Sequence, residues 1–314
     1  MQQGSAKKIL SGILKVAISV GGLAYIFWKV PFTEVCGHWT SQALPWIALI
    51  LFCTLFSMAI QANRWRCLLL EEGKKITFRT FYAYIALGYF FNNLLPSGFG
   101  GDAVKTIAFG KRFGNIANSV AAVAISRVMG LIAMFICFFA TLPFVVARYD
   151  IPAMYTGAVC AVALVSVLVI AGGLFSDKIK LPAFLTSKVP FLLKLQDAFS
   201  IYRGYKKAFL LSGLDSIWLQ ISSIAIHYAY FQAVGVPVDL ATITVFMTIT
   251  ITVSMLPISI NGIGLREGVN VSLFTGLLGI PADIVLAAAL IGYIPMVFQA
   301  VQGACVFAAI GKRK

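Results

Sequence analysis

Long apolar runs separated by short polar and basic segments dominate the sequence. A helix that crosses a bilayer needs about 20 mostly apolar residues. Six runs reach that length, and we expect each to span the membrane: residues 9–28, 43–62, 119–146, 153–175, 208–234 and 284–310. The pattern therefore predicts an all-α polytopic membrane protein, with residues 1–314 forming a single membrane domain.

Two further apolar runs, residues 80–95 and 241–256, are short for a crossing. Each ends in Leu-Pro followed by glycines and charged residues. Proline removes a backbone donor and glycine weakens a helix, so both runs should break within the membrane. We predict two oppositely oriented re-entrant hairpins, at about residues 80–110 and 241–280, in an inverted-repeat-like arrangement. The predicted break residues are Pro96, Gly98, Gly100, Gly101, Pro257, Asn261, Gly262 and Gly264.

Composition and charge agree with a membrane location. Sixty per cent of the residues are apolar and 11% are charged, whereas soluble domains carry about 25% charged residues. The net charge of +14 could suggest nucleic acid, but the basic residues lie between apolar runs. If the N-terminus is cytoplasmic and both short runs are hairpins, 20 of the 25 Lys and Arg residues lie on the cytoplasmic side of the membrane. Only Lys29 and Arg148 lie on the other side, and the remaining three are within apolar runs. This bias predicts that both termini are cytoplasmic.

Other motifs give little support to cofactor chemistry. The six cysteines form no CxxC pair and the chain has two histidines, so we predict no metal site. The phosphate-loop spacing GxxxxGK[ST] is absent, and nucleotide binding is not supported. The basic segment 176–207 is interpreted either as an amphipathic helix on the inner leaflet or as a solvated connector.

Charged residues within or beside apolar runs are the main candidates for function. A charge at the centre of a membrane helix costs about 2.5–3.5 kcal/mol by insertion scales, so it is paired, faces water or has a function. The candidates for headgroup binding are Arg64, Asp102, Lys105, Arg127, Arg266 and Glu267. Two interpretations remain open: internal salt bridges that hold the broken helices together, or arginines that bind an anionic headgroup.

Polar residues recur at helical spacing. On the run 208–234 they lie 4, 3 and 4 residues apart, which places them on one helix face. We predict that a polar cavity is lined by Gln61, Asn92, Asn93, Ser216, Gln220, Ser223 and His227. The alternative is ordinary hydrogen bonding between helices. The motif Arg64-Trp65-Arg66 is interpreted either as an anchor of its helix at the membrane surface, made of an aromatic ring and two bases, or as a site that attracts anionic lipid headgroups.

Four sequence motifs carry a resemblance to a known family. They are Asn63-Arg64-Trp65, Leu95-Pro96 through Gly100-Gly101-Asp102 with Lys105, Ser126-Arg127, and Leu256-Pro257 through Gly264-Leu265-Arg266-Glu267-Gly268. Together they resemble the lysylphosphatidylglycerol synthase transmembrane region, also called the flippase-like domain. The resemblance implies translocation of anionic or aminoacylated phospholipids between leaflets of the bacterial inner membrane. Lys105 departs from the arginine that relatives often have.

In two-domain relatives a soluble C-terminal domain transfers lysine from tRNA to the lipid. Here the chain ends at Lys314, directly after the last predicted helix, so we expect no synthase activity.

The leading functional prediction is a lipid flippase. Its expected partners are membrane lipids, and a homo-oligomer or a separate lipid-modifying enzyme is possible in addition; nucleic acid is not expected. The alternatives are an integral-membrane transferase with Asp102 or Glu267 as base, and a secondary transporter for a small anion. A fluorescent-lipid exchange assay would discriminate between them.

Overall fold

A computed structural model describes residues 32–94, 100–113, 116–174, 202, 204–255, 259 and 262–311, and the regular elements among them are all helices. The all-α prediction is therefore confirmed for this part of the chain. The predicted first span, residues 9–28, and most of the connector 176–207 lie outside it. The elements are α2 (Phe32–Gly37), η1 (Ser41–Ala43), α3 (Leu44–Leu68), α4 (Leu70–Lys74), α5 (Phe78–Leu94), α6 (Gly100–Phe113), α7 (Ile116–Val146), α8 (Ala153–Leu174), α11 (Lys206–Ala233), α12 (Leu240–Ser254), α13 (Leu265–Asn270), the π-helical turn η2 (Val271–Thr275), α14 (Gly276–Leu278), α15 (Ala282–Ile291) and α16 (Tyr293–Gly311).

Four helical stretches among the described residues are long and apolar enough to cross a membrane. They are Ser41–Leu68, Asn118–Val146, Lys206–Ala233 and Ala282–Ala309, and the shorter apolar helices Ala153–Leu168 and Leu240–Ser254 accompany them. The structure differs from the prediction in the last stretch, which is two helices rather than one. Pro295 lies in the first turn of α16 and has no N–H for the carbonyl of Ile291, so the helix breaks at Gly292.

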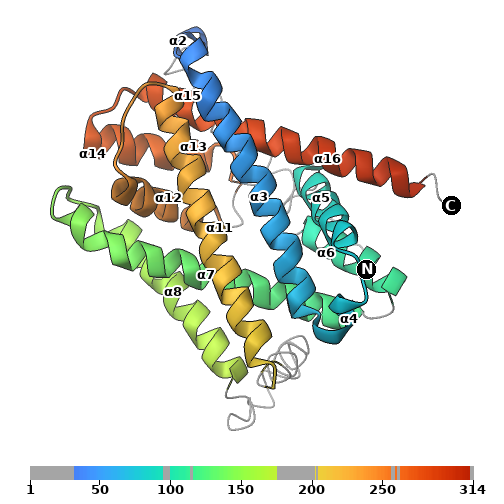
Figure 1. The fold of residues 1–314 in the computed structure, drawn as a ribbon. Helices are drawn as coiled ribbons and strands as arrows, with labels where there is room; N and C mark the ends of the chain where they lie inside the picture. The colour runs from blue at the N-terminus through green and yellow to red at the C-terminus, as the bar shows by residue number, and fades with distance from the viewer. Residues whose placement is uncertain are drawn as a thin grey trace, which may run out of the picture.

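Helices α3 and α11 lie side by side through the centre of the molecule (Figure 1). They are antiparallel. At one end the rings of Trp46 and Tyr228 meet edge to face with centroids 6.1 Å apart. At the other end Asn63 Nδ2 donates to Asp215 Oδ2 at 3.0 Å. The two hairpins of the molecule are oriented relative to this α3–α11 pair.

Helices α5 and α6 form an antiparallel hairpin on the α3 side of that pair (Figure 1). Near its closed end the N–H of Gly101 donates to Asn92 Oδ1 at 2.8 Å. Near its open end the rings of Tyr84 and Phe109 lie 5.3 Å apart. Gly101 is required here because a Cβ at this position would overlap the Gly88 carbonyl oxygen.

Helix α12 forms a second antiparallel hairpin with α13 and η2. Thr250 Oγ1 donates to Asn270 Oδ1 at 2.8 Å, and the rings of Phe246 and Phe274 lie 5.0 Å apart. These contacts pair residues that are successively further from the turn, as antiparallel arms require. The π-helical turn lies in the returning arm, and such turns are often found near functional sites.

The start of α12 is fixed by an N-cap. Asp239 accepts the backbone N–H of Thr242 at 3.0 Å and the Thr242 hydroxyl at 2.7 Å. Partial burial acts to raise the pKa of Asp239, but the hydrogen bonds from Thr242 and the charge of Arg148 outweigh it, and the pKa lies below its ordinary value. The cap is therefore present above the ordinary pKa and is lost as the pH falls through the lowered one.

The two hairpins open towards opposite ends of α3. The open end of the first packs on Trp65, near the C-terminus of α3, through Phe81 and Phe109. The second begins after α11 has returned to the N-terminal end of α3, where Trp39 Nε1 donates to the Ala287 carbonyl at 3.3 Å. The opposite orientation expected from the sequence is thus present relative to α3. That both hairpins turn within the membrane stays a prediction.

Trp65 is buried, and the prediction that it anchors the helix at the surface is wrong. Only 2% of the residue is exposed. Its ring centroid lies 5.5 Å from that of Phe81 and 4.8 Å from that of Phe109. The arginines on either side suggested an interfacial position, but the aromatic rings of the hairpin bury the indole. Aromatic contacts of this kind add about 0.5–1.5 kcal/mol each to the burial of the rings.

Gly101→Ala should destabilise the first hairpin. The added Cβ would overlap the Gly88 carbonyl and force α5 and α6 apart, and overpacking of this kind costs about 1–3 kcal/mol. Gly157→Ala on α8 is the control, because nothing lies within 4 Å of the Cβ it would add. Thermal unfolding in detergent micelles should show a lower Tm for Gly101→Ala alone. Equal Tm values for the two variants would contradict the close packing.

Candidate functional site

Asp102 is the centre of a first charged cluster. It lies in the first turn of α6 and is 9% exposed. Its Oδ1 lies 2.6 Å from Lys105 Nζ, and its Oδ2 accepts from Arg127 Nε at 2.7 Å and forms an ion pair with Arg127 Nη2. Helix α6 thus supplies one carboxylate and one cation, and α7 supplies the second cation. Lys105 also lies over the ring of Trp65, 5.6 Å from its centroid.

Arg64 brings a third cation to this cluster from α3. It is 8% exposed, and its Nη1 donates to Ser216 Oγ on α11 at 2.8 Å. Its buried Nε has no hydrogen-bond partner among the described residues. Asp102, Arg127 and Asp215 lie close enough to act on it electrostatically, but Asp215 is engaged by Asn63. No carboxylate in the described part of the chain forms an ion pair with Arg64.

Polar side chains around this cluster are used in the contacts between helices. Gln61 Nε2 donates to the Tyr89 hydroxyl at 2.7 Å, joining α3 to α5. Asn92 binds the N–H of Gly101, and Asn93 Nδ2 donates to the Met296 carbonyl of α16 at 3.1 Å. Of the three, Gln61 and Asn92 adjoin the charged side chains, whereas Asn93 lies between α5 and α16.

Glu267 is the centre of a second charged cluster, in the first turn of α13. It is 1% exposed. Its Oε2 accepts the N–H of Gly264 at 2.7 Å, and its Oε1 accepts the Tyr293 hydroxyl at 3.1 Å. Gly264 has φ +80°, a conformation that favours glycine and lets its N–H point back at the carboxylate. The carboxylate thereby fixes the start of the returning arm.

Arg266 completes this second cluster. Its Nε and Nη2 lie 3.1 Å and 2.9 Å from Glu267 Oε1, and its guanidinium lies over the Tyr293 ring, 4.9 Å from the centroid. The side chain is still 30% exposed. Glu267 and the Tyr293 ring thus hold the guanidinium in place, and its Nη1 stays without a hydrogen bond to the described residues.

One face of α11 connects the two clusters. Ser216 contacts Arg64 of the first cluster, and Arg266 of the second lies close enough to His227 and Tyr230 to act on both electrostatically. From Ser216 to Tyr230 the helix rises about 21 Å. Between them lie Gln220 and Ser223, which are half-buried and whose side chains hydrogen-bond to none of the described residues. His227 Nδ1 bonds the Ser223 carbonyl at 2.7 Å.

The predicted charged residues are therefore brought together in two groups. Arg64, Asp102, Lys105 and Arg127 form the first, and Arg266 and Glu267 form the second. Gly100, Gly101, Gly262 and Gly264 lie at the starts of the returning arms. Pro96, Gly98, Pro257 and Asn261 lie outside the described residues.

Three residues near these groups were not predicted from the sequence: Tyr89, Asp215 and Tyr293. For Asp215 a signal existed, because an acidic residue within an apolar helix is itself unusual. The tyrosines gave no such signal, since their rings suit any membrane helix. Among the described residues no three His, Cys, Asp or Glu side chains are grouped so that they could hold a metal ion.

Fold and site together define a helical membrane protein with two paired-charge clusters on oppositely directed hairpins. The chain belongs to the lysylphosphatidylglycerol synthase TM region family, which matches residues 12–299. It is also 32% identical over 101 residues to a UPF0104 membrane protein of Methanothermobacter thermautotrophicus. That match spans 32% of this chain and 28% of the relative. The family prediction is thus confirmed, and a membrane location with it.

Asp102→Asn should strongly destabilise the protein. Loss of the carboxylate would leave Lys105 and Arg127 without their shared anion, and breaking a buried ion pair costs about 3–5 kcal/mol. Adding Lys105→Met should recover part of the loss, because it removes one uncompensated cation. Chemical unfolding of both variants in micelles measures this. A double variant no more stable than Asp102→Asn would show that the Lys105 charge is not the cause.

Proposed function

We propose that the protein is a lipid translocase, which moves an anionic phospholipid headgroup between the two leaflets without a covalent step. The main support is the charge of the first cluster. Three cations, Arg64, Lys105 and Arg127, lie near two carboxylates, Asp102 and Asp215, which leaves an excess of one positive charge. Excess positive charge in membrane-spanning helices is costly unless an anion balances it.

A phosphate group fits the chemistry of this cluster. Guanidinium groups bind phosphate through paired, charge-assisted hydrogen bonds that are about twice as strong as neutral ones. Arg64 is held by Ser216 and has no ion-pair partner among the described residues. A phosphate would supply the missing anion. Asp102 would keep Lys105 and Arg127 in place between binding events.

The polar face of α11 offers a route from the first cluster to the second. A headgroup that leaves Arg64 would next meet Gln220 and Ser223, and then Arg266. Its acyl chains would stay in the bilayer, because the opposite face of α11 exposes apolar side chains such as Leu214 and Ile221. One cluster lies at each end of this proposed route.

The family name supports the proposed class of lipid. It refers to lysylphosphatidylglycerol, a derivative of an anionic glycerophospholipid. We therefore propose phosphatidylglycerol or a related phospholipid as the cargo, in the cytoplasmic membrane with both termini inside.

Reconstitution in liposomes tests the function. Fluorescent phosphatidylglycerol in the inner leaflet is protected from dithionite until it is moved to the outer one. The protein should accelerate the loss of protected fluorescence well beyond that in empty liposomes. A rate no greater than in empty liposomes, across several lipids and gradients, would refute the proposal.

Arg64→Gln should abolish most of this exchange. The glutamine amide is neutral and shorter than arginine, so it removes both the charge that binds phosphate and the bond to Ser216. We expect a fall of at least about tenfold, because a charged hydrogen bond contributes about 1.5–3 kcal/mol. Arg79→Gln, an exposed residue at the start of α5, is the control. Unchanged exchange in Arg64→Gln would show that this guanidinium is structural.

Ser223→Leu should block the route while leaving both clusters intact. The larger apolar side chain would fill the polar face of α11 midway between Ser216 and Tyr230. Ile221→Leu, on the exposed apolar face, is the matched control. Exchange should fall in Ser223→Leu alone. Equal rates in the two variants would mean that the headgroup does not pass along this face.

A further inference from the structure

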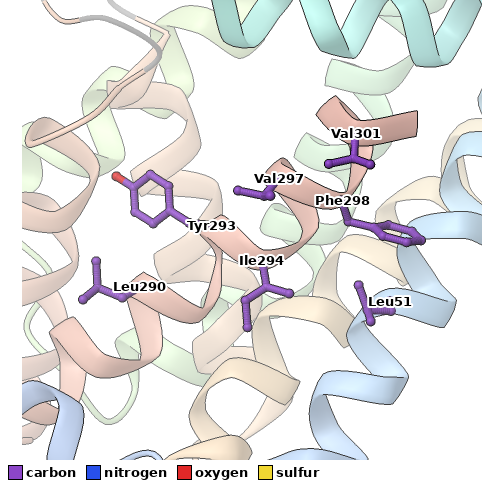
Figure 2. A pocket seen from close by; sticks show the side chains of 7 residues that line it. All are labelled: Leu51, Leu290, Tyr293, Ile294, Val297, Phe298 and Val301. Carbon is purple, nitrogen blue, oxygen red and sulfur yellow. The ribbon is translucent and has the colours of Figure 1, made fainter. Parts of the chain in front are cut away.

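An apolar groove lies between α3 and the two halves of the last helical stretch. It is a shallow groove, open to the surroundings, with a volume of about 500 Å³. Leu51 of α3 and Leu290 of α15 line it together with Ile294, Val297 and Phe298 of α16 (Figure 2). Val297 is 58% exposed, so the groove is open along its side to what surrounds the helices.

Tyr293 connects this groove to the second charged cluster. Its ring lines the groove, and its hydroxyl points away from Phe298 and Leu51 (Figure 2). The hydroxyl donates to Glu267, and the ring lies beneath the guanidinium of Arg266. A partly exposed cation therefore lies beside the apolar groove. This is the charge distribution that complements an amphiphile with an anionic head.

Two features keep Tyr293 in this position. Gly292, which separates α15 from α16, lies against the ring of Tyr230 of α11, where a Cβ would lie 3.4 Å from Cε2. Pro295 prevents the two helices from continuing into one another. The break thus turns Tyr293 towards Glu267 and leaves the side chains that follow it along the groove.

We propose that the groove holds one acyl chain of an anionic lipid whose phosphate binds the exposed side of Arg266. This proposal rests on the proposed function and names where the cargo is held at the second cluster. A lipid chain fits better than a peptide, because the lining is aliphatic and aromatic and the Tyr293 hydroxyl is already used by Glu267. A peptide backbone would leave its polar groups unpaired there.

Filling the groove with an indole tests the proposal. Val297→Trp places a large side chain in the groove, and Val301→Trp does so one helical turn further along. Val165→Trp is the matched control, because Val165 on α8 is 59% exposed, against 58% for Val297. The probe is dodecyl phosphate, which has one alkyl chain and one phosphate, and glycerol phosphate is the probe without a chain. Native mass spectrometry of the full chain in micelles measures binding of both.

Val297→Trp and Val301→Trp should each weaken dodecyl phosphate binding by about tenfold or more. Val165→Trp should bind as the unchanged protein does. Glycerol phosphate binding should be the same in all four proteins, because it does not use the groove. Arg266→Gln should weaken the binding of both probes when all the proteins also carry Arg64→Gln, because the first cluster then no longer competes for the phosphate. The Tm of each variant shows whether it is folded.

The outcomes separate this proposal from the proposed function. Normal dodecyl phosphate binding in both folded groove variants would refute the proposal that the groove holds an acyl chain. This holds even if Arg64→Gln abolishes lipid exchange. Loss of dodecyl phosphate binding in those variants, with no exchange by the unchanged protein, would support the groove as a lipid site and refute translocation. Loss of glycerol phosphate binding in the groove variants would refute the assignment of the groove to the chain, because a probe without a chain would then depend on it.

Discussion

Burial of charge in an apolar environment is the constraint on which this structure depends. An unpaired charge at membrane depth costs several kcal/mol. Both clusters avoid this cost in the same way. Asp102 is the third residue of α6 and Glu267 is the third residue of α13. At these positions a carboxylate is stabilised by the N-terminal end of its helix and pairs with neighbouring cations. Each returning arm thus begins with a fixed negative charge that determines where its cations lie.

The two hairpins place their charged clusters towards opposite ends of the α3–α11 pair. Close backbone packing of α5 on α6 at Gly101 and the bond from Thr250 to Asn270 hold the arms together. Since the hairpins open in opposite directions along α3, the two clusters lie beside different parts of α11. The polar face of α11 reaches both, from Ser216 to Tyr230. Hairpins, clusters and central helix therefore form one connected polar system within otherwise apolar helices.

Much of this could be predicted from the sequence, because apolar length and Leu-Pro-glycine breaks depend on local chemistry. Local chemistry of this sort predicts where α7 and α12 end. It also predicts that charges near the breaks are paired. What could not be predicted depends on packing between distant segments. Trp65 has the sequence context of a surface anchor, yet Phe81 and Phe109 bury it. Gly292 and Pro295 beside Tyr293 indicate a helix break, but they do not show that Tyr293 joins Glu267 to the groove along α16.

The two clusters differ in charge balance, and this difference bears on how a headgroup would travel between them. The first has three cations for two nearby carboxylates, Asp102 and Asp215. In the second, Arg266 and Glu267 balance each other. A phosphate would be held more strongly where the positive charge is in excess. The second cluster would hold it weakly by charge and would depend more on the apolar groove beside Tyr293. Binding by charge at one end and by the chain at the other would prevent either site from retaining the lipid too tightly, which passage between leaflets requires.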